Sequence, residues 1–349
     1  MLGRLALVVG SVLFTLAALE IGCRLWSGPA SLLDWSNIVL EDRRATRAAG
    51  VGRLKYDPEL GFVPTPGYAA NGVTYDRLGY RVTPAPSDLA LAEPPILVVG
   101  DSYAHGDEVS DGETWAALLQ SPTRRRTVNA GVSGYGLDQI VLRAERVARE
   151  IKPAAIVLVF IAEDLRRSEM KRVWGAEKPY FEPSGGAPVL RNVPVPPSPE
   201  AASTLTPGQR LFGWSVLVDT VLKHKGWQYE WAIDHDRVLP RGDGEKLACP
   251  LLERLARAGV TTLVVAAYDP YVWRDPDYAR EQRRLSAVVL ECARAAGLGT
   301  LDLFETIDQA VSKLGYAAIF RSSHPGPTGH QITAERIAAA LARLHMPSR

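Results

Sequence analysis

The sequence has little cysteine, no excess charge of either sign and only one long apolar run. Its 349 residues hold three cysteines, and 40 basic side chains offset 39 acidic ones. Because a net charge close to zero provides no general attraction to polyanions, we expect no nucleic-acid partner. The cysteines lack metal-ligand spacing, and an odd number does not form a closed disulfide framework. We therefore expect no metal site at these cysteines, and we predict no cofactor.

Two of the cysteines, Cys249 and Cys292, lie in the second half of the chain. A disulfide between them is compatible with an oxidising compartment. Free cysteine is also among the residue types that are most often buried. On this basis the sequence favours two buried free thiols over a disulfide.

The apolar run covers residues 5–26, which is about the length needed to cross a bilayer. Arg4 precedes it, which favours a cytoplasmic N-terminus. No small-x-small cleavage site follows cleanly, because Glu20 stands just past the best candidate. We predict an uncleaved membrane anchor over residues 1–27, with the rest of the chain extracytoplasmic (periplasmic or at the cell surface). The alternatives are a cleaved signal peptide, a lipoprotein site at Cys23 and a core helix of a cytosolic esterase.

Changes in composition divide the remainder of the chain. Residues 28–92 are predicted to form a stalk and a small β-rich lead-in, and residues 93–346 the main domain. Within that domain, residues 168–240 are an insertion, because eight prolines fall between residues 179 and 207. Residues 211–222 are an apolar helix candidate inside it. This helix could be a lid, a membrane-surface helix or plain packing, and plain packing is the default.

The main domain alternates between predicted strands and predicted helices. Short β-branched runs predict strands near residues 96, 127, 155, 261 and 299. Segments of helical periodicity separate them, and a last helix runs through residue 344. This alternation predicts an α/β fold, with about five parallel strands between two helical layers.

Ser102 stands where the first of these strands ends and a helix begins. The carboxyl edge of such a sheet is where ligands bind. His324, just before the last helix, is the obvious base for a serine nucleophile. The backbone N–H groups of Ser102 and Gly134 are candidate oxyanion donors. The chain lacks the G-x-S-x-G elbow around the serine, which argues against the α/β-hydrolase fold.

Four motifs in order resemble the SGNH/GDSL hydrolase superfamily: GDSYAHG at 100–106, NAGVSGYG at 129–136, FIAEDLRR at 160–167 and HPGPTGH at 324–330. The resemblance is closest to a bacterial group with an N-terminal membrane segment. It implies a three-layer, flavodoxin-like α/β/α domain. It also implies that Ser102 is the nucleophile, that Gly134 donates a backbone N–H group to the oxyanion, and that His324 is the base.

Two positions depart from the pattern of that superfamily. The asparagine that usually donates to the oxyanion is replaced by Glu163, and the aspartate three residues before the histidine by Arg321. Three interpretations stay open. The site could be a Ser102–His324 dyad with a backbone carbonyl orienting the ring, or it could be degenerate. Alternatively, another acid could reach the ring, the candidates being Asp101, Asp302, Glu305 and Asp164.

His105 also follows the serine closely, and it could line the pocket, contact a polar substrate or have no role. The predicted function is a serine esterase or acyltransferase that acts on acyl esters of a small molecule or glycan. The resemblance and the predicted location favour an envelope polysaccharide. The alternative is a non-catalytic binding or scaffold module in envelope polymer assembly, which the departures at Glu163 and Arg321 favour.

Overall fold

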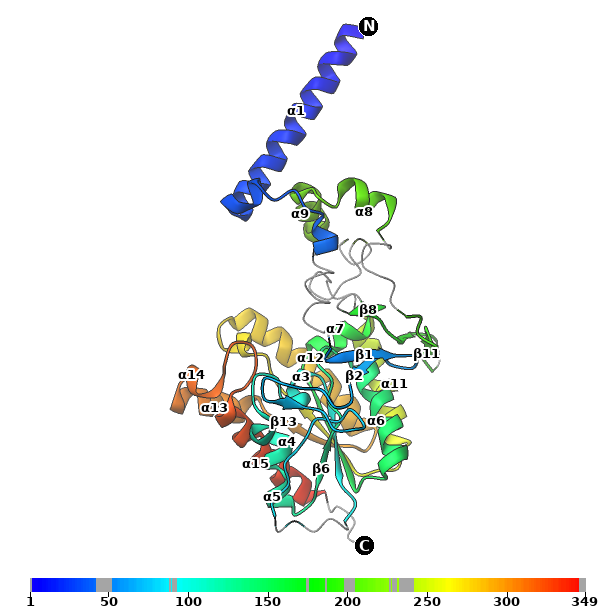
Figure 1. Ribbon diagram of the computed structural model, residues 1–349, viewed down its shortest axis with the longest axis vertical. Helices are drawn as coiled ribbons and strands as arrows, with labels where there is room; N and C mark the ends of the chain where they lie inside the picture. The colour runs from blue at the N-terminus through cyan, green and yellow to red at the C-terminus, as the bar shows by residue number, and fades with distance from the viewer. Residues whose placement is uncertain are drawn as a thin grey trace. The chain divides into compact units, whose positions relative to one another are not determined.

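The computed structural model describes residues 2–41, 52–87, 89, 93–173, 176–185, 187–197, 205–225, 227, 231 and 242–344 (Figure 1). Its contacts divide the chain into two units. Unit 1 comprises Met1–Val51, Arg172–Ala176 and Pro197–Leu239. Unit 2 comprises Gly52–Lys171, Glu177–Pro196 and Pro240–Arg349.

A five-stranded parallel sheet forms the centre of unit 2, in the order β13-β12-β7-β5-β6. Taken along the chain this is the order 2-1-3-4-5, which is the flavodoxin-like arrangement. The central strands are continuous apolar runs because both of their faces are covered. The predicted parallel sheet is confirmed, with strands β5 (Ile96–Gly100), β6 (Thr127–Asn129), β7 (Ala155–Phe160), β12 (Thr262–Ala266) and β13 (Gly299–Asp302).

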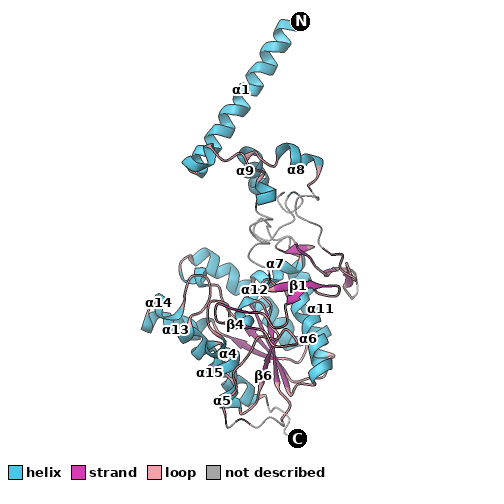
Figure 2. Ribbon diagram, viewed as in Figure 1, coloured by secondary structure: helices cyan, strands magenta, loops and turns pink. Residues whose placement is uncertain are grey.

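Helices cover both faces of this sheet (Figure 2). On one face α6 and α12 pack against the strands and α11 packs against both helices, and on the other face α4 and α15 pack against each other and the strands. The predicted three layers are therefore present. The main helices of unit 2 are α6 (Leu137–Ile151), α11 (Asp243–Ala256), α12 (Pro276–Ala295), α13 (Phe304–Leu314) and α15 (Pro327–Arg343).

The shorter helical segments lie mostly in loops between strands and long helices. One of them, α14, lies between α13 and the loop that carries His324. They are α3 (Ser102–His105), η2 (Asp111–Glu113), α4 (Trp115–Leu118), α5 (Gln120–Thr123), α7 (Glu163–Ser168), η5 (Pro270–Trp273) and α14 (Tyr316–Ile319).

The lead-in forms two small hairpins in unit 2. Strands β1 (Leu54–Asp57) and β2 (Gly61–Pro64) pair antiparallel, as do β3 (Ala69–Ala70) and β4 (Val73–Thr74). The Tyr135 hydroxyl donates to the carbonyl of Phe62 at 2.5 Å. The lead-in is thus attached to the start of α6 in the main domain.

The proline-rich insertion contains short strands and two helices. Strand β8 (Arg172–Val173) pairs with β9 (Ala176–Glu177), and β10 (Tyr180–Glu182) pairs antiparallel with β11 (Val189–Arg191). In unit 2, the fully buried Lys178 donates to Asp138 of α6 at 2.5 Å. Burial lowers the pKa of this lysine and raises the pKa of its aspartate partner. This buried ion pair joins the β9–β10 segment to the main domain.

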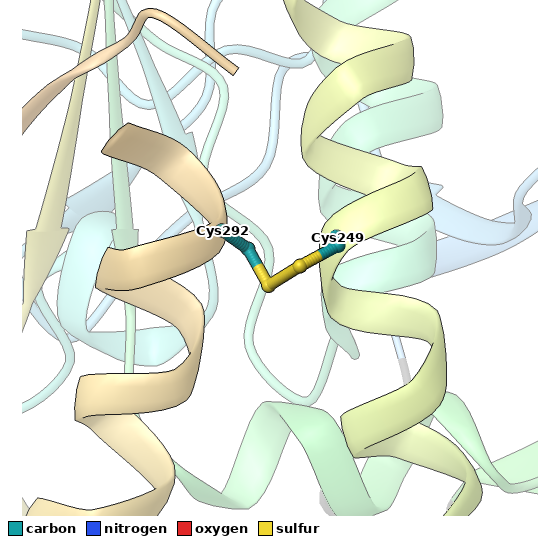
Figure 3. Close-up of a disulfide and its surroundings, with 2 residues drawn as sticks. All are labelled: Cys249 and Cys292. Carbon is teal, nitrogen blue, oxygen red and sulfur yellow. A yellow bond between two sulfur atoms is a disulfide. The ribbon is translucent and has the colours of Figure 1, made fainter. Parts of the chain in front are cut away.

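Cys249 and Cys292 form a disulfide between α11 and α12 (Figure 3). The expectation of two free thiols was therefore wrong. The two helices pack side by side, which brings the Cα atoms to 4.6 Å although the residues are 43 positions apart. Spacing along the chain could not indicate this, because the approach depends on how the helices pack.

In unit 1, the apolar run forms the single helix α1 (Leu2–Ser27), followed by η1 (Pro29–Leu32). Among the described residues, α1 is the one helix long and apolar enough to cross a membrane. Residues 3–19 are all exposed, so α1 is not a core helix of a soluble protein. The apolar helix expected at residues 211–222 is two helices, α8 (Pro207–Phe212) and α9 (Val216–Lys225).

Candidate active site

Ser102 begins α3 directly after β5, at the carboxyl edge of the sheet. In the sheet, β5 lies between β6 and β7, so the chain leaves β5 at the point where the strand order reverses. Such switch points form crevices in which ligands bind. Gly100 makes the turn possible. Its φ is +154°, and a Cβ there would lie 2.3 Å from the carbonyl oxygen of Val159. Asp101 caps the short helix by accepting from the Tyr103 N–H at 2.9 Å.

His324 comes from the loop before α15 and reaches the serine. Its Nε2 lies 2.8 Å from the Ser102 Oγ, although 222 positions separate the two residues. The ring also lies against Tyr103, with centroids 5.1 Å apart. Backbone bonds close the loop, since Phe320 pairs with Pro325 and the Arg321 N–H donates to the His324 carbonyl at 3.0 Å. The structure therefore brings the expected nucleophile and base into hydrogen-bond contact.

The other ring nitrogen of the histidine faces Glu108, a residue that sequence reasoning missed. Its Oε1 lies 3.2 Å from the His324 Nδ1. The same carboxylate accepts from the N–H and hydroxyl of Ser322 at 2.9 and 2.7 Å, and from the hydroxyl of Ser323 at 2.7 Å. Burial alone would raise the pKa of Glu108, but these hydrogen bonds lower it to about 2. The carboxylate is therefore charged at neutral pH.

None of the four acids named from the sequence is bonded to the ring. Asp302 accepts from the Phe304 N–H at 2.9 Å, and Glu305 pairs with Arg283 at 3.2 Å. The arrangement also differs from a dyad oriented by a backbone carbonyl, because Nδ1 faces the Glu108 carboxylate and the Ser323 hydroxyl. No sequence signal pointed to Glu108, since it follows Ser102 instead of preceding His324.

Asp101 and Asp164 share one guanidinium, buried behind the serine. The Arg167 Nη1 donates to them at 3.1 and 2.7 Å. Burial raises the pKa of both carboxyls, and the charge of Asp101 raises that of Asp164 further. The Ser102 Oγ lies 3.4 Å from Asp101, which is longer than its contact with His324. Asp101, Asp164 and Arg167 thus form a buried ion-pair network that supports the turn at Ser102.

The two departures from the family pattern are accounted for locally. Glu163 is ion-paired with Arg166, one turn along α7. Arg321 is exposed, with its side chain over Gly326. The two serines that follow Arg321 donate to Glu108, a carboxylate from another loop that faces His324 Nδ1.

A buried polar cluster holds the loop that carries Glu108. Arg81 is 2% exposed and donates to the carbonyls of His105 and Val109 at 2.9 and 2.6 Å. His105 Nδ1 lies 2.7 Å from Asp107, and its Nε2 lies 2.9 Å from the Tyr75 hydroxyl. Burial lowers the pKa of His105 to about 4, so this ring is neutral. His105 therefore supports the loop that carries Glu108.

Gly134 lies in the loop after β6, which packs against the serine turn. The Val132 N–H donates to the Gly100 carbonyl at 3.0 Å, and a Cβ on Gly131 would lie 2.5 Å from the backbone nitrogen of His105. Gly134 has φ +82°, a value that favours glycine. Ser133 donates to Asp107 at 2.8 Å, which ties this loop to the one that carries Glu108.

A family model supports what this geometry indicates. The model of the GDSL-like lipase/acylhydrolase family matches residues 98–332, which is more than half of the chain and includes Ser102, Gly134 and His324. The chain belongs to this family. As a member of the GDSL family it is a hydrolase that acts on ester bonds.

Solved structures of low identity are also similar to this GDSL family member. An α/β hydrolase, LAE5, from the metagenome of Lake Arreo is 16% identical, with 74% of this chain and 99% of that chain covered and a TM-score of 0.45. A variant of Axe2, an acetyl-xylooligosaccharide esterase from Geobacillus, is 15% identical, with 75% and 99% covered and a TM-score of 0.45. The comparison with curated proteins finds no match. The family assignment therefore rests on the family model.

Proposed function

We propose that this chain hydrolyses acyl esters through Ser102, with His324 as general base and Glu108 orienting the ring. The observation that carries the proposal is the 2.8 Å contact between Ser102 Oγ and His324 Nε2. A serine hydroxyl is a weak nucleophile until a positioned base accepts its proton. The Glu108 carboxylate at the opposite nitrogen favours the tautomer in which Nδ1 carries the hydrogen and Nε2 is free to accept.

The proposed reaction has two half-reactions. Ser102 Oγ attacks the ester carbonyl, its proton passes to His324, and the oxyanion accepts hydrogen bonds from the backbone N–H groups of Ser102 and Gly134. Collapse breaks the C–O bond, and His324 returns the proton to the leaving alkoxide. Water then attacks the acyl-serine with the same base. Because Glu163 replaces the usual asparagine, we expect two donors in place of three.

We further propose that the reaction takes place outside the cytoplasm, with α1 as a retained anchor. The disulfide between Cys249 and Cys292 supports an oxidising compartment, because such bonds are rare in the cytosol. An acylated envelope glycan is the substrate class that this location favours. A sugar hydroxyl that replaces water in the second half-reaction would make the chain an acyltransferase.

A fluorophosphonate probe tests the serine directly. The full-length protein should be labelled, Ser102→Ala should not, and the exposed Ser121→Ala should be labelled like the unchanged protein. Folding of each variant is checked by circular dichroism. A folded protein that is not labelled, or labelling that survives Ser102→Ala, would contradict the esterase proposal. That outcome would favour the non-catalytic binding module.

A further inference from the structure

The structure points to a second membrane-contacting element beside the anchor, built from two separate segments of unit 1. We propose that six exposed apolar side chains around the end of α1 lie in the membrane interface. We call these six side chains the collar. They come from residues 26–35 and 211–214 and are Trp26, Leu33, Trp35, Leu211, Phe212 and Trp214. This inference rests on the membrane anchoring proposed above and does not depend on the catalytic mechanism.

The first observation is the length of the uncharged part of α1. Residues 5–19 lie between Arg4 and Glu20 and, at 1.5 Å per residue, span about 22 Å. A bilayer core is about 30 Å thick, so the helix crosses it only if Glu20 and Arg24 also approach the hydrocarbon boundary. Charges at that depth are tolerated when they are paired and shielded by protein. The residues around these two charges must supply that shielding.

The second observation is that Glu20 and Arg24 are paired and buried. The Arg24 Nε donates to the Glu20 Oε1 at 2.7 Å, and both side chains are less than 10% exposed. Glu20 also caps α9, because its carboxylate accepts from the N–H groups of Val216 and Leu217 at 3.0 Å each and from the Ser215 hydroxyl at 2.7 Å. The anchor helix and the insertion therefore share one polar centre.

Arg24 connects the remaining segment to the same centre. Its Nη1 donates to the Ser31 carbonyl at 2.6 Å and its Nη2 to the Trp214 carbonyl at 2.7 Å. Its guanidinium lies 3.8 Å from the centroid of the Trp35 ring. The Trp35 and Trp214 rings are 5.6 Å apart. Two collar tryptophans, Trp35 and Trp214, therefore lie beside the charged pair.

The third observation is the chemistry of the collar surface. Its side chains are 38–94% exposed, and three of the six are tryptophan. Tryptophan is enriched at the boundary between hydrocarbon and headgroups, where its ring and its N–H group are both accommodated. The collar continues the exposed apolar surface of α1, so the same lipid surface covers both. Residues 211–214 therefore belong to a membrane-surface element and not to plain packing, which was our default.

The proposal is tested on the full chain in a Cys23→Ser background, with the disulfide intact. A nitrobenzoxadiazole label is attached at Leu211→Cys or at Leu33→Cys. The matched control is Leu314→Cys, a comparably exposed leucine on α13 in unit 2. Each protein is reconstituted into vesicles of three parts phosphatidylcholine to one part phosphatidylglycerol. Quenching is measured with iodide in the water and with lipids spin-labelled near the headgroup.

We expect the labels at residues 211 and 33 to emit at shorter wavelength than the label at 314. They should lose several-fold more emission to the spin-labelled lipids and resist iodide, whereas residue 314 should behave in the opposite way. Equal iodide quenching at 211 and 314 would refute the proposal. Resistance to both quenchers would also overturn it, because a protein partner or a second copy would then cover the collar.

Two further measurements separate this result from the other proposals. Intact mass of the purified protein should include residues from Met1, and a mass that lacks α1 would overturn the collar. Hydrolysis of a soluble ester is measured on the same samples. If hydrolysis fails while residue 211 is quenched by lipid, the esterase mechanism is wrong and the collar stands. If hydrolysis is retained while residue 211 is not quenched by lipid, the collar proposal is wrong and the esterase mechanism stands.

Discussion

Replacement of Glu108 by glutamine removes the negative charge that lies 3.2 Å from His324 Nδ1 while keeping the size of the side chain. For two unit charges at this distance, Coulomb's law with an effective dielectric of 20 gives about 5 kcal/mol. The two side chains are 24% and 17% exposed, so solvent screening reduces this to about 2–3 kcal/mol. The charge on His324 exists in the transition state, so we expect kcat to fall about 100-fold.

The assay is steady-state hydrolysis of a soluble chromogenic ester by full-length protein in detergent. Glu108→Gln should lower kcat with little change in KM, because Glu108 is proposed to act through the histidine and not on the substrate. The matched control is Glu113→Gln, since Glu113 lies in the same region but binds Ser110 and not the catalytic ring. A kcat within threefold of the unchanged protein would refute the role of Glu108. That result would favour a Ser102–His324 dyad that functions without an acid.

Two further predictions concern stability. Replacing both Cys249 and Cys292 by alanine opens a loop of 43 positions, and the chain-entropy relation predicts a loss of about 4 kcal/mol in the free energy of unfolding. Denaturant-induced unfolding should therefore show a lower midpoint. An unchanged midpoint would mean that the disulfide does not form. Lys178→Met leaves Asp138 buried without its partner and should lower the free energy of unfolding by about 3–5 kcal/mol. The double variant Asp138→Leu/Lys178→Met should lose less than the single one, and an equal loss would mean that the unpaired carboxylate does not cause the destabilisation.

The loops that carry Ser102, Glu108 and His324 show why only part of the site could be predicted. Ser102 and His324 each stand at a local boundary, one at a strand end and the other just before a helix, and such boundaries are visible in the pattern of apolar residues. Glu108 lies in a loop whose path depends on Arg81, a residue from the lead-in that binds three of its carbonyls. Nothing in the local sequence around Glu108 indicates that it turns toward the histidine loop.

Residue patterns along the chain determined the order of strands and helices, the apolar helix α1, and Ser102, Gly134 and His324 as candidates. These properties depend on short-range periodicity and on turns such as the one at Gly100, so they can be identified locally. The acid beside His324, the Cys249–Cys292 disulfide and the contacts of Glu20 and Arg24 with residues 214–217 were decided by the tertiary structure. Each depends on segments that are distant in sequence, whose approach follows from the packing of the whole fold.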